Sequence, residues 1–219
     1  DYAALKAWET AQRRDNPLVP DASVDLVISN CVLNLVDDHE KQHMIREIFR
    51  VLKPGGRIAI SDIVSDQMIP ANMKNDPELW SGCISGAFRE DEFLDAFTTA
   101  GFNAACYDKW DAEPWRIIED IEFRSVTLTA IKPEVGNEQI IDRAVIYRGP
   151  FAGVVDDNGQ TYIRGKRVNI SGTTHSLLVN PAFGNAFIDL SATGNNVPGS
   201  SCCGPVETVT TEPSSDGCC

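Results

Sequence analysis

Cysteine is the residue type with the most distinctive placement in this chain. Seven cysteines occur among the 219 residues, three dispersed in the first half and four in two adjacent pairs near the carboxyl terminus. In chain order they are Cys31, Cys83, Cys106, Cys202, Cys203, Cys218 and Cys219. Thiolates are the ligands that soft, thiophilic elements prefer. An odd number of cysteines in a chain of this size does not indicate the disulfide framework of a small secreted domain.

Two of these cysteines stand where a thiol could do chemistry. Cys31 comes directly after a predicted strand over 24–29, and Cys83 lies in a predicted loop with the sequence Trp-Ser-Gly-Cys-Ile-Ser-Gly. A lone cysteine is most often a small buried apolar residue. Two cysteines in loops near the ligand-binding edge of a sheet instead favour a site for a soft ligand. Cys106 falls in a predicted strand, and we interpret it as structural.

Two other sets of possible ligands are less specific. The paired cysteines of the tail could chelate soft ions, although an incidental tail or a redox pair explains them equally well. His39 and His43 are four residues apart on a predicted helix. The solvated face of an amphipathic helix accounts for that spacing without a metal.

The segment from 24 to 61 predicts the elements that would position Cys31. In order, these are a strand over 24–29, a helix over 39–52, a Pro-Gly-Gly turn at 54–56 and a strand over 57–61. The first strand is apolar at nearly every position, which is typical of a parallel strand buried on both faces. A strand–helix–strand unit of this kind builds a parallel sheet.

The rest of the chain predicts further elements of both kinds. We expect a loop over 64–86, a helix over 89–100, a strand over 104–108, a helical segment within 110–121 and an edge strand over 123–131. Beyond Pro133 short β-like pieces follow, at 144–147, 153–155, 160–163, 166–170 and 174–179. Asp157-Asn158-Gly159 is a strong hairpin signal. The Gly/Ser/Pro/Thr-rich residues from 192 onward predict a disordered tail.

Charge and hydropathy exclude several classes of protein. The formal net charge is −13, which argues against binding to nucleic acid or to an anionic membrane surface. No apolar run approaches the roughly 18 residues of a membrane span, and residues 1–14 lack the apolar region of a signal peptide. We therefore expect a cytoplasmic protein with neither a nucleic-acid nor a membrane partner.

Taken together, the two cysteine motifs resemble those of the arsenite methyltransferases. The motifs are Ser-Asn-Cys-Val-Leu-Asn-Leu at 29–35 and Asn-Asp-Pro-Glu-Leu-Trp-Ser-Gly-Cys-Ile-Ser-Gly-Ala at 75–87. The segments 113–115, 121–127 and 144–150 and the terminal cysteine pairs also fit, so the resemblance covers about 18–219. The Leu-Lys-Pro-Gly-Gly segment at 52–56 resembles the corresponding turn of class I S-adenosylmethionine-dependent methyltransferases.

The resemblance implies an enzyme that methylates trivalent arsenic presented as a thiol conjugate. S-adenosyl-L-methionine would donate the methyl group, and glutathione or thioredoxin would serve as the thiol reductant. Cys31 and Cys83 match two arsenic-binding catalytic cysteines, while Ser29, Asn30 and Cys31 would line the cofactor pocket. The tail cysteines Cys202, Cys203, Cys218 and Cys219 could capture arsenite. Thiolates would direct the arsenic lone pair at the methyl carbon, so much of the catalysis would be proximity and orientation.

The resemblance also implies the domain organisation. The fold class would be α/β, with a partial Rossmann-like class I methyltransferase sheet followed by a small, mostly β unit and a disordered tail. The expected divisions are an N-terminal helix at 1–17 that matches the family poorly, a partial methyltransferase domain at 18–133, an accessory domain at 134–191 and a flexible, Cys-rich tail at 192–219. We expect a monomer.

Two features depart from the pattern of the family. The chain contains no Gly-x-Gly sequence, so the glycine-rich loop that cradles the cofactor is not identifiable, and neither is the acidic residue that would hold its ribose. We therefore expect the C-terminal two-thirds of a longer enzyme, inactive by itself. Two alternatives stay open: a non-catalytic thiolate binder of metalloids or soft metals, and a methyltransferase for a small organic molecule with incidental cysteines.

Overall fold

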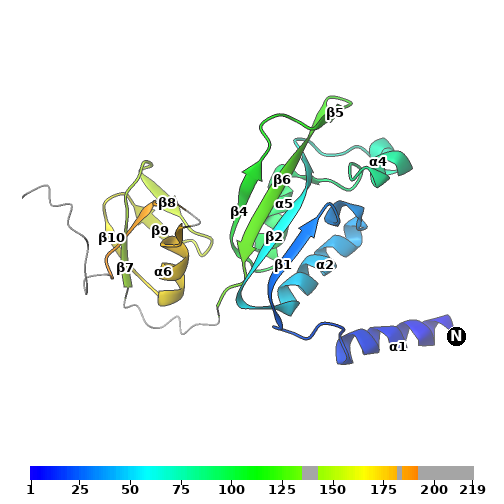
Figure 1. The fold of residues 1–219 in the computed structure, drawn as a ribbon, viewed down its shortest axis with the longest axis horizontal. Helices are drawn as coiled ribbons and strands as arrows, with labels where there is room; N and C mark the ends of the chain where they lie inside the picture. The colour runs from blue at the N-terminus through cyan, green and yellow to red at the C-terminus, as the bar shows by residue number, and fades with distance from the viewer. Residues whose placement is uncertain (135–142, 182–183, 192–219) are drawn as a thin grey trace, which may run out of the picture.

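A computed structural model of the chain describes residues 1–134, 143–181 and 184–191 (Figure 1). A mixed sheet with helices occupies the first of these ranges, and a smaller group of strands occupies the other two. The predicted boundary between these regions, near residue 133, stays a prediction, and the expected disordered tail at 192–219 lies outside the described residues. None of the described helices is long and apolar enough to cross a membrane.

The larger sheet has four main strands in the spatial order β1–β2–β6–β4. Their bounds are β1 Val24–Asn30, β2 Leu52–Ser65, β4 Asn103–Trp110 and β6 Ile121–Ile131. β1 and β2 are parallel, whereas β6 runs antiparallel to both of its neighbours. The position of β6 between β2 and β4 corrects the prediction of an edge strand over 123–131. Its alternating pattern arises because only one of its faces is covered by helices.

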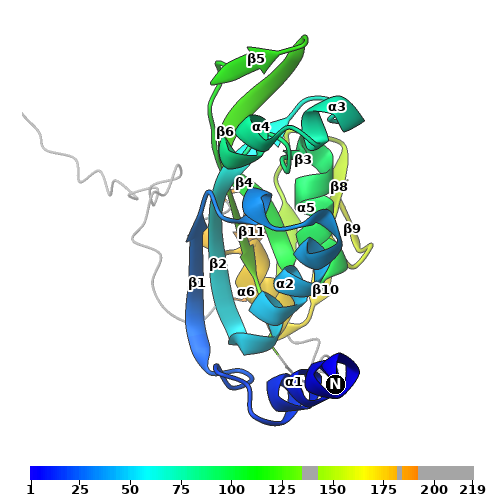
Figure 2. The same ribbon diagram turned by 90° about the vertical axis from the view of Figure 1, so that its right-hand side faces the viewer.

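Two amphipathic helices cover one face of this sheet: α2, Asp38–Val51, and α5, Glu90–Thr99 (Figures 1 and 2). Helix α2 connects β1 to β2, which confirms the predicted strand–helix–strand unit. The side chains of the core come from both helices, from β2 and β6 and from the segments that flank the helices. Its fully buried members are Leu33, Ile45, Leu52, Ile60, Phe93, Phe97, Val126 and Leu128.

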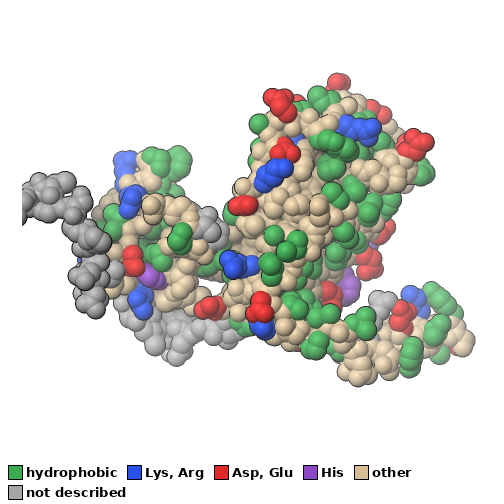
Figure 3. Space-filling view, in the orientation of Figure 1, with side chains coloured by type: hydrophobic (Ala, Val, Ile, Leu, Met, Phe, Trp, Pro, Cys, Tyr) green, Lys and Arg blue, Asp and Glu red, His purple; other side chains and the backbone are tan. Residues whose placement is uncertain are grey.

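The opposite face of the sheet carries no helix in the part of the chain that the structure describes (Figures 1 and 2). Leu26 and Ile28 of β1 point to this face and are 52% and 70% exposed, and apolar side chains are visible across it (Figure 3). The predicted burial of 24–29 on both faces is therefore wrong. Only the face with Val24 and Val27 packs against the core, and β1 is the last described strand of the sheet.

Helix α1, Tyr2–Asp15, extends away from the sheet (Figure 1). The Asp1 carboxylate caps it by accepting a hydrogen bond from the Ala4 backbone N–H at 2.9 Å. The apolar side chains of the helix, among them Leu5 and Trp8, are largely exposed. The helix expected in this region is therefore present, but it contributes nothing to the described core.

Three other sequence-based expectations are corrected in this domain. The segment 64–86, predicted as a loop, contains two short helices: α3 Ala71–Lys74 and α4 Pro77–Ser81. The segment 110–121, predicted as helical, instead forms β5, Arg116–Ile118, which pairs with β6 as a hairpin. The Pro-Gly-Gly turn is a bulge at the start of β2, where Val24 pairs with Leu52 but Leu26 pairs with Arg57.

The smaller unit consists mostly of short antiparallel strands. Strand β7, Arg143–Tyr147, lies between β10, Arg167–Ile170, and β11, Phe187–Asp189. Strands β8, Gly153–Val155, and β9, Thr161–Ile163, form the hairpin predicted at 157–159. The expected strand at 174–179 is wrong, because Ser171 caps helix α6, Gly172–Leu178, by accepting a hydrogen bond from the Thr174 backbone N–H.

Candidate thiol site at the carboxyl end of β1

Cys31 leaves β1 in a conformation that few side chains adopt. Its backbone N–H donates to the Ser61 carbonyl of β2 at 2.9 Å, so the chain is still held to the sheet at this point. Its φ angle is +53°, a left-handed conformation that costs a residue with a Cβ about 1–2 kcal/mol. Strained backbone of this kind is concentrated at functional sites. The side chain is exposed, with Sγ 3.3 Å from Asn30 Oδ1.

The chain after Cys31 is fixed by a buried carboxylate at the end of β2. Asp62 Oδ2 accepts hydrogen bonds from the backbone N–H groups of Leu33 and Asn34, at 3.0 and 3.3 Å. These residues begin a single 3₁₀ turn, η1, Leu33–Leu35. Asp62 is only 2% exposed, and burial raises the pKa of its carboxyl despite the hydrogen bonds that it accepts.

Cys83 reaches the same place from a distant part of the sequence. It follows α4, its φ angle is +60°, and its Sγ lies 3.7 Å from the Cys31 carbonyl oxygen. The structure thus brings together the two cysteines that sequence analysis singled out, and both have left-handed backbone. Their assignment as catalytic residues stays a prediction.

Three buried polar contacts hold the loop that carries Cys83. The Nζ of Lys41, a residue that is 3% exposed, donates to the Gly86 carbonyl at 2.6 Å and to Asp38 at 2.5 Å. The Ser85 hydroxyl donates to the Met73 carbonyl at 2.7 Å. The Asn34 amide donates to the carbonyl of Cys83 itself at 3.1 Å. These contacts tie the loop to α2, α3 and η1, and of the three only the one from Asn34 reaches Cys83 itself.

Sequence analysis did not identify the residues that make these contacts. Asn34 lies inside the motif quoted for Cys31, and Asp62 stands at the carboxyl end of a predicted strand, so both had a weak positional signal. Nothing in the sequence marked Lys41, because a lysine on an amphipathic helix is normally solvated. Burial of a charged group is visible only once the packing of α2 against the loop is known.

The electrostatic environment keeps both thiols protonated at neutral pH. Burial raises the pKa of the Cys31 thiol, and the negative charge of Asp62 raises it further. The pKa of the Cys83 thiol is also raised, first by burial and then by Asp62 and Cys31. The site is therefore not built for a permanently ionised nucleophile. It suits ligands that condense with neutral thiols and release water.

The predicted cofactor residues Ser29 and Asn30 lie at the carboxyl end of β1, next to Cys31. They pair in register with Ile60 and Ser61 of β2, and the side chain of Asn30 is exposed. Open α/β sheets bind ligands outside the carboxyl ends of their strands, which is where these residues lie, and their assignment to a cofactor site stays a prediction. No described strand pairs with the outer edge of β1.

The other candidate ligands form no site in the described structure. Cys106 lies on β4 with its Sγ 3.4 Å from the Thr129 hydroxyl, in keeping with a structural role. Among residues 1–134, 143–181 and 184–191 no group of three or more His, Cys, Asp or Glu could hold a metal ion. His39 and His43 are exposed. The cysteine pairs 202–203 and 218–219 lie outside the described residues.

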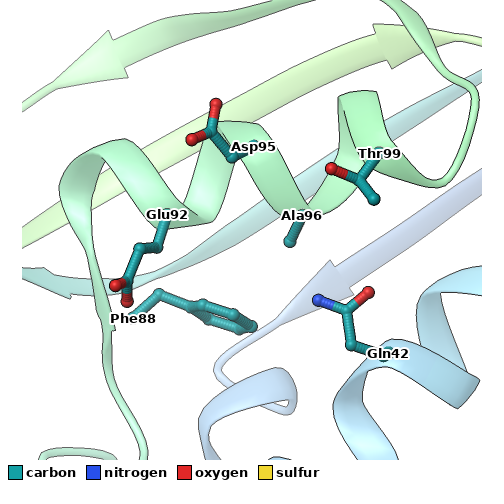
Figure 4. Close-up of a pocket in the computed structure, with 6 residues that line it drawn as sticks. All are labelled: Gln42, Phe88, Glu92, Asp95, Ala96 and Thr99. Carbon is teal, nitrogen blue, oxygen red and sulfur yellow. The ribbon is translucent and has the colours of Figure 1, made fainter.

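A separate hollow lies between α2 and α5 (Figure 4). Its lining comes from both helices and from the short strand β3, Phe88–Arg89. The lining residues are Gln42, Phe88, Glu92, Asp95, Ala96 and Thr99. Two carboxylates stand at this hollow and no thiol does, so it is not part of the cysteine site.

Comparison with known proteins shows that this chain is similar to methyltransferases. Residues 10–101 match a family described as a methyltransferase domain, and residues 136–214 match a domain of unknown function, DUF8838. A similar solved structure is CrArsM, an arsenic(III) S-adenosylmethionine methyltransferase from Chlamydomonas reinhardtii. Its TM-score is 0.53 at 24% identity, over 81% of this chain and 63% of that one. The predicted fold class is thereby confirmed.

Curated sequence relatives narrow the assignment. The human arsenite methyltransferase is 30% identical over 200 residues, which are 86% of this chain and 52% of the relative. The arsenite methyltransferase of Halobacterium salinarum is 45% identical over 86 residues, 39% of this chain and 22% of the relative. The chain thus spans about half the length of the human protein that it matches.

The fold and the matched domain are those of class I S-adenosylmethionine-dependent methyltransferases. Within that class, the human arsenite methyltransferase is 30% identical over 86% of this chain. The chain belongs to the arsenite methyltransferase family.

Removing the charge of Asp62 should make both thiols more reactive. A carboxylate beside a thiol disfavours the thiolate, so Asp62→Asn is expected to lower the pKa of Cys31 and Cys83 and to raise the thiolate fraction at any pH below those pKa values. At pH 8 the iodoacetamide alkylation rate of both residues should rise roughly threefold or more. Mass-spectrometric peptide mapping measures each cysteine separately. Cys106 provides the internal control, and equal acceleration there would contradict a local charge effect.

Two glycines of the Cys83 loop should differ in how well they tolerate a methyl group. A Cβ at Gly86 would lie 2.0 Å from the Asn34 carbonyl oxygen, whereas at Gly82 the nearest atom would be at an ordinary 3.4 Å. We expect Gly86→Ala to lower the free energy of unfolding by about 1–3 kcal/mol and Gly82→Ala to change it by less than about 0.5 kcal/mol. Urea unfolding of the two variants is the measurement. Equal stability would show that the loop does not pack against η1 as described.

Proposed function

We propose that this chain binds trivalent arsenic through Cys31 and Cys83, and that the protein containing it methylates that arsenic. The observation that carries the proposal is the meeting of two cysteines from distant segments, with Cys83 Sγ 3.7 Å from the Cys31 carbonyl oxygen. The family supports the same assignment, because the curated relatives are arsenite methyltransferases. Two thiols on adjacent loops suit a soft, trivalent element.

Arsenic binding by this pair is a balanced condensation. Arsenous acid carries three hydroxyl groups, and two of its As–O bonds are replaced by As–S bonds to Cys31 and Cys83. Each thiol proton leaves with a hydroxide as water, so no other base is required. The raised pKa values of the two thiols are compatible with this reaction, because the protons are released as part of the condensation. A third thiol, as in a glutathione conjugate, can occupy the remaining arsenic position.

In the methylation step the chain's own residues position the arsenic. S-adenosyl-L-methionine, when bound, supplies an electrophilic methyl group. The two sulfurs hold the arsenic near the carboxyl end of β1, where Ser29 and Asn30 would contact the cofactor. With the arsenic fixed, its lone pair has a restricted direction, and the gain in rate is one of orientation. Glutathione or thioredoxin would supply the two electrons that return the methylated arsenic to the trivalent state.

Non-catalytic binding of arsenic is the second candidate function. It is favoured by the lack of a Gly-x-Gly sequence in this chain, since that loop forms the other side of cofactor sites in related folds. Incubation of the natural-length gene product with arsenite, glutathione and S-adenosyl-L-methionine separates the two. Methylated arsenicals are expected from the methyltransferase, whereas binding without methylation would leave the chain as a binder. Methylation of an organic acceptor that persists in Cys31 and Cys83 variants would instead support the small-molecule alternative.

The cellular setting belongs to the same proposal. Cys31, Cys83 and Cys106 are free thiols, which suits a reducing compartment such as the cytoplasm. The strongly negative charge favours small-molecule partners over nucleic acid or anionic membranes. We further propose that the chain acts as a monomer on arsenic presented as a thiol conjugate.

Replacing either cysteine of the site should weaken arsenic binding strongly. Cys31→Ser or Cys83→Ser leaves a single thiol, and loss of the chelate should weaken binding by roughly 100-fold. Equilibrium dialysis with arsenite, read by elemental mass spectrometry, measures the affinity. Cys106→Ser is the matched control and should bind like the wild type. To remove the contribution of the tail, all variants are compared in a background with serine at 202, 203, 218 and 219. An arsenite affinity that is unchanged in Cys31→Ser would contradict the proposal.

The tail cysteines should add binding capacity without being needed at the site. In otherwise wild-type protein, replacing Cys202, Cys203, Cys218 and Cys219 by serine should lower the number of arsenic atoms bound per chain. The Cys31–Cys83 site should keep its affinity, because none of its described contacts involves the tail. The same dialysis assay gives both quantities. An unchanged stoichiometry would show that the tail does not capture arsenic.

A further inference from the structure

Asn34 joins the two cysteine segments through one buried amide. It lies in η1, three residues after Cys31, and its side chain is fully buried, with 0% exposure. Its Nδ2 donates to the Ile63 carbonyl of β2 at 2.7 Å and to the Cys83 carbonyl at 3.1 Å. A single side chain therefore connects the segment after Cys31, the end of β2 and the backbone of Cys83.

The backbone of Asn34 is also fixed, by contacts other than the one between its amide and the Cys83 carbonyl. Its N–H donates to Asp62 Oδ2 at 3.3 Å, and its carbonyl oxygen packs so closely against Gly86 that a Cβ there would lie 2.0 Å away. The amide thus projects from a backbone that is already held by β2 and the loop. The hydrogen bond from the amide fixes the Cys83 carbonyl. The fixed carbonyl in turn restricts where the Cys83 thiol can lie.

The asparagine is only partly satisfied at this position. Its Oδ1 is buried and has no hydrogen-bond partner among the described residues. A buried acceptor without a partner is destabilising; an apolar side chain of similar size would avoid that cost but would leave the Ile63 and Cys83 carbonyls without this donor. Such a side chain could not hold the Cys83 carbonyl. In return, the two hydrogen bonds that the amide donates fix the geometry of the cysteine pair.

We propose that Asn34 is a positioning residue that holds the Cys83 thiol within reach of Cys31, so that both can bind one arsenic atom. The inference rests on the proposed function, because the separation of the thiols matters only if they share a ligand. Cys83 has a strained φ of +60°. Without the bond to its carbonyl, its backbone can relax and move the thiol. Each thiol then stays reactive by itself, while binding through both is lost.

A probe that requires two thiols tests this separation directly. Phenylarsine oxide, hydrated to its dihydroxy form, exchanges two As–O bonds for two As–S bonds and releases two waters. Asn34→Ala should weaken its binding by about tenfold or more, because the second thiol no longer adds as an intramolecular ligand. Alkylation of Cys31 and Cys83 by iodoacetamide needs one thiol at a time and should change by less than about twofold. All measurements use the background with serine at the four tail positions.

Ser85→Ala is the matched control for a general loosening of the loop. Ser85 is as deeply buried as Asn34, and its hydroxyl donates to the Met73 carbonyl at 2.7 Å rather than to the backbone of a cysteine. This variant should lose a comparable amount of melting temperature and retain the phenylarsine oxide affinity of the parent protein. If Asn34→Ala does not fold, Asn34→Ser, whose hydroxyl lies one bond short of the position of the amide nitrogen, should also lose affinity for phenylarsine oxide.

The outcomes separate this inference from the proposed function. Failure of the parent protein to bind phenylarsine oxide overturns both. Binding by the parent that a folded Asn34→Ala or Asn34→Ser variant fully retains overturns only the positioning role. An equal loss of affinity in Ser85→Ala would assign the effect to loop stability and also overturn it.

Discussion

The hydrogen bonds at the end of β2 are the constraint on which the thiol site depends. Where β1 ends, the chain stays attached to β2, first through the Cys31 N–H and then through the Asp62 carboxylate. This attachment creates η1, and η1 in turn is the surface against which the Cys83 loop packs. These hydrogen bonds extend the sheet beyond the end of its regular strand pairing, and the thiol site is built on that extension.

Geometry and electrostatics act in opposite directions at this site. The carboxylate that organises η1 also places a negative charge near two thiols and opposes their ionisation. An enzyme that used a cysteine as a free nucleophile would be impaired by that arrangement. A ligand that takes both sulfurs and removes their protons as water is affected far less, so the same carboxylate can serve as scaffold without preventing binding.

Local patterns in the sequence identified the unit around 24–61 and the two cysteines, because helix periodicity and extended motifs are properties of adjacent residues. Local patterns did not predict features that depend on contacts between residues distant in the sequence. Pro114 suggested a helix start, but pairing with β6 makes 116–118 a strand. The apolar pattern of β1 suggested burial on both faces, but its exposure depends on what lies beside it in space. The bonds of Asn34 and Lys41 join segments that are 45 to 49 residues apart, and no local pattern marks them.

The left-handed backbone at Cys31 and Cys83 has an evolutionary consequence. Glycine adopts this conformation without steric cost, so drift from cysteine to glycine at either position would relieve strain as it removed a sulfur. Under the proposed function, protein stability and arsenic binding are therefore opposed at these two positions. A population freed from exposure to arsenic should lose these cysteines more readily than it loses Cys106, whose backbone carries no such strain.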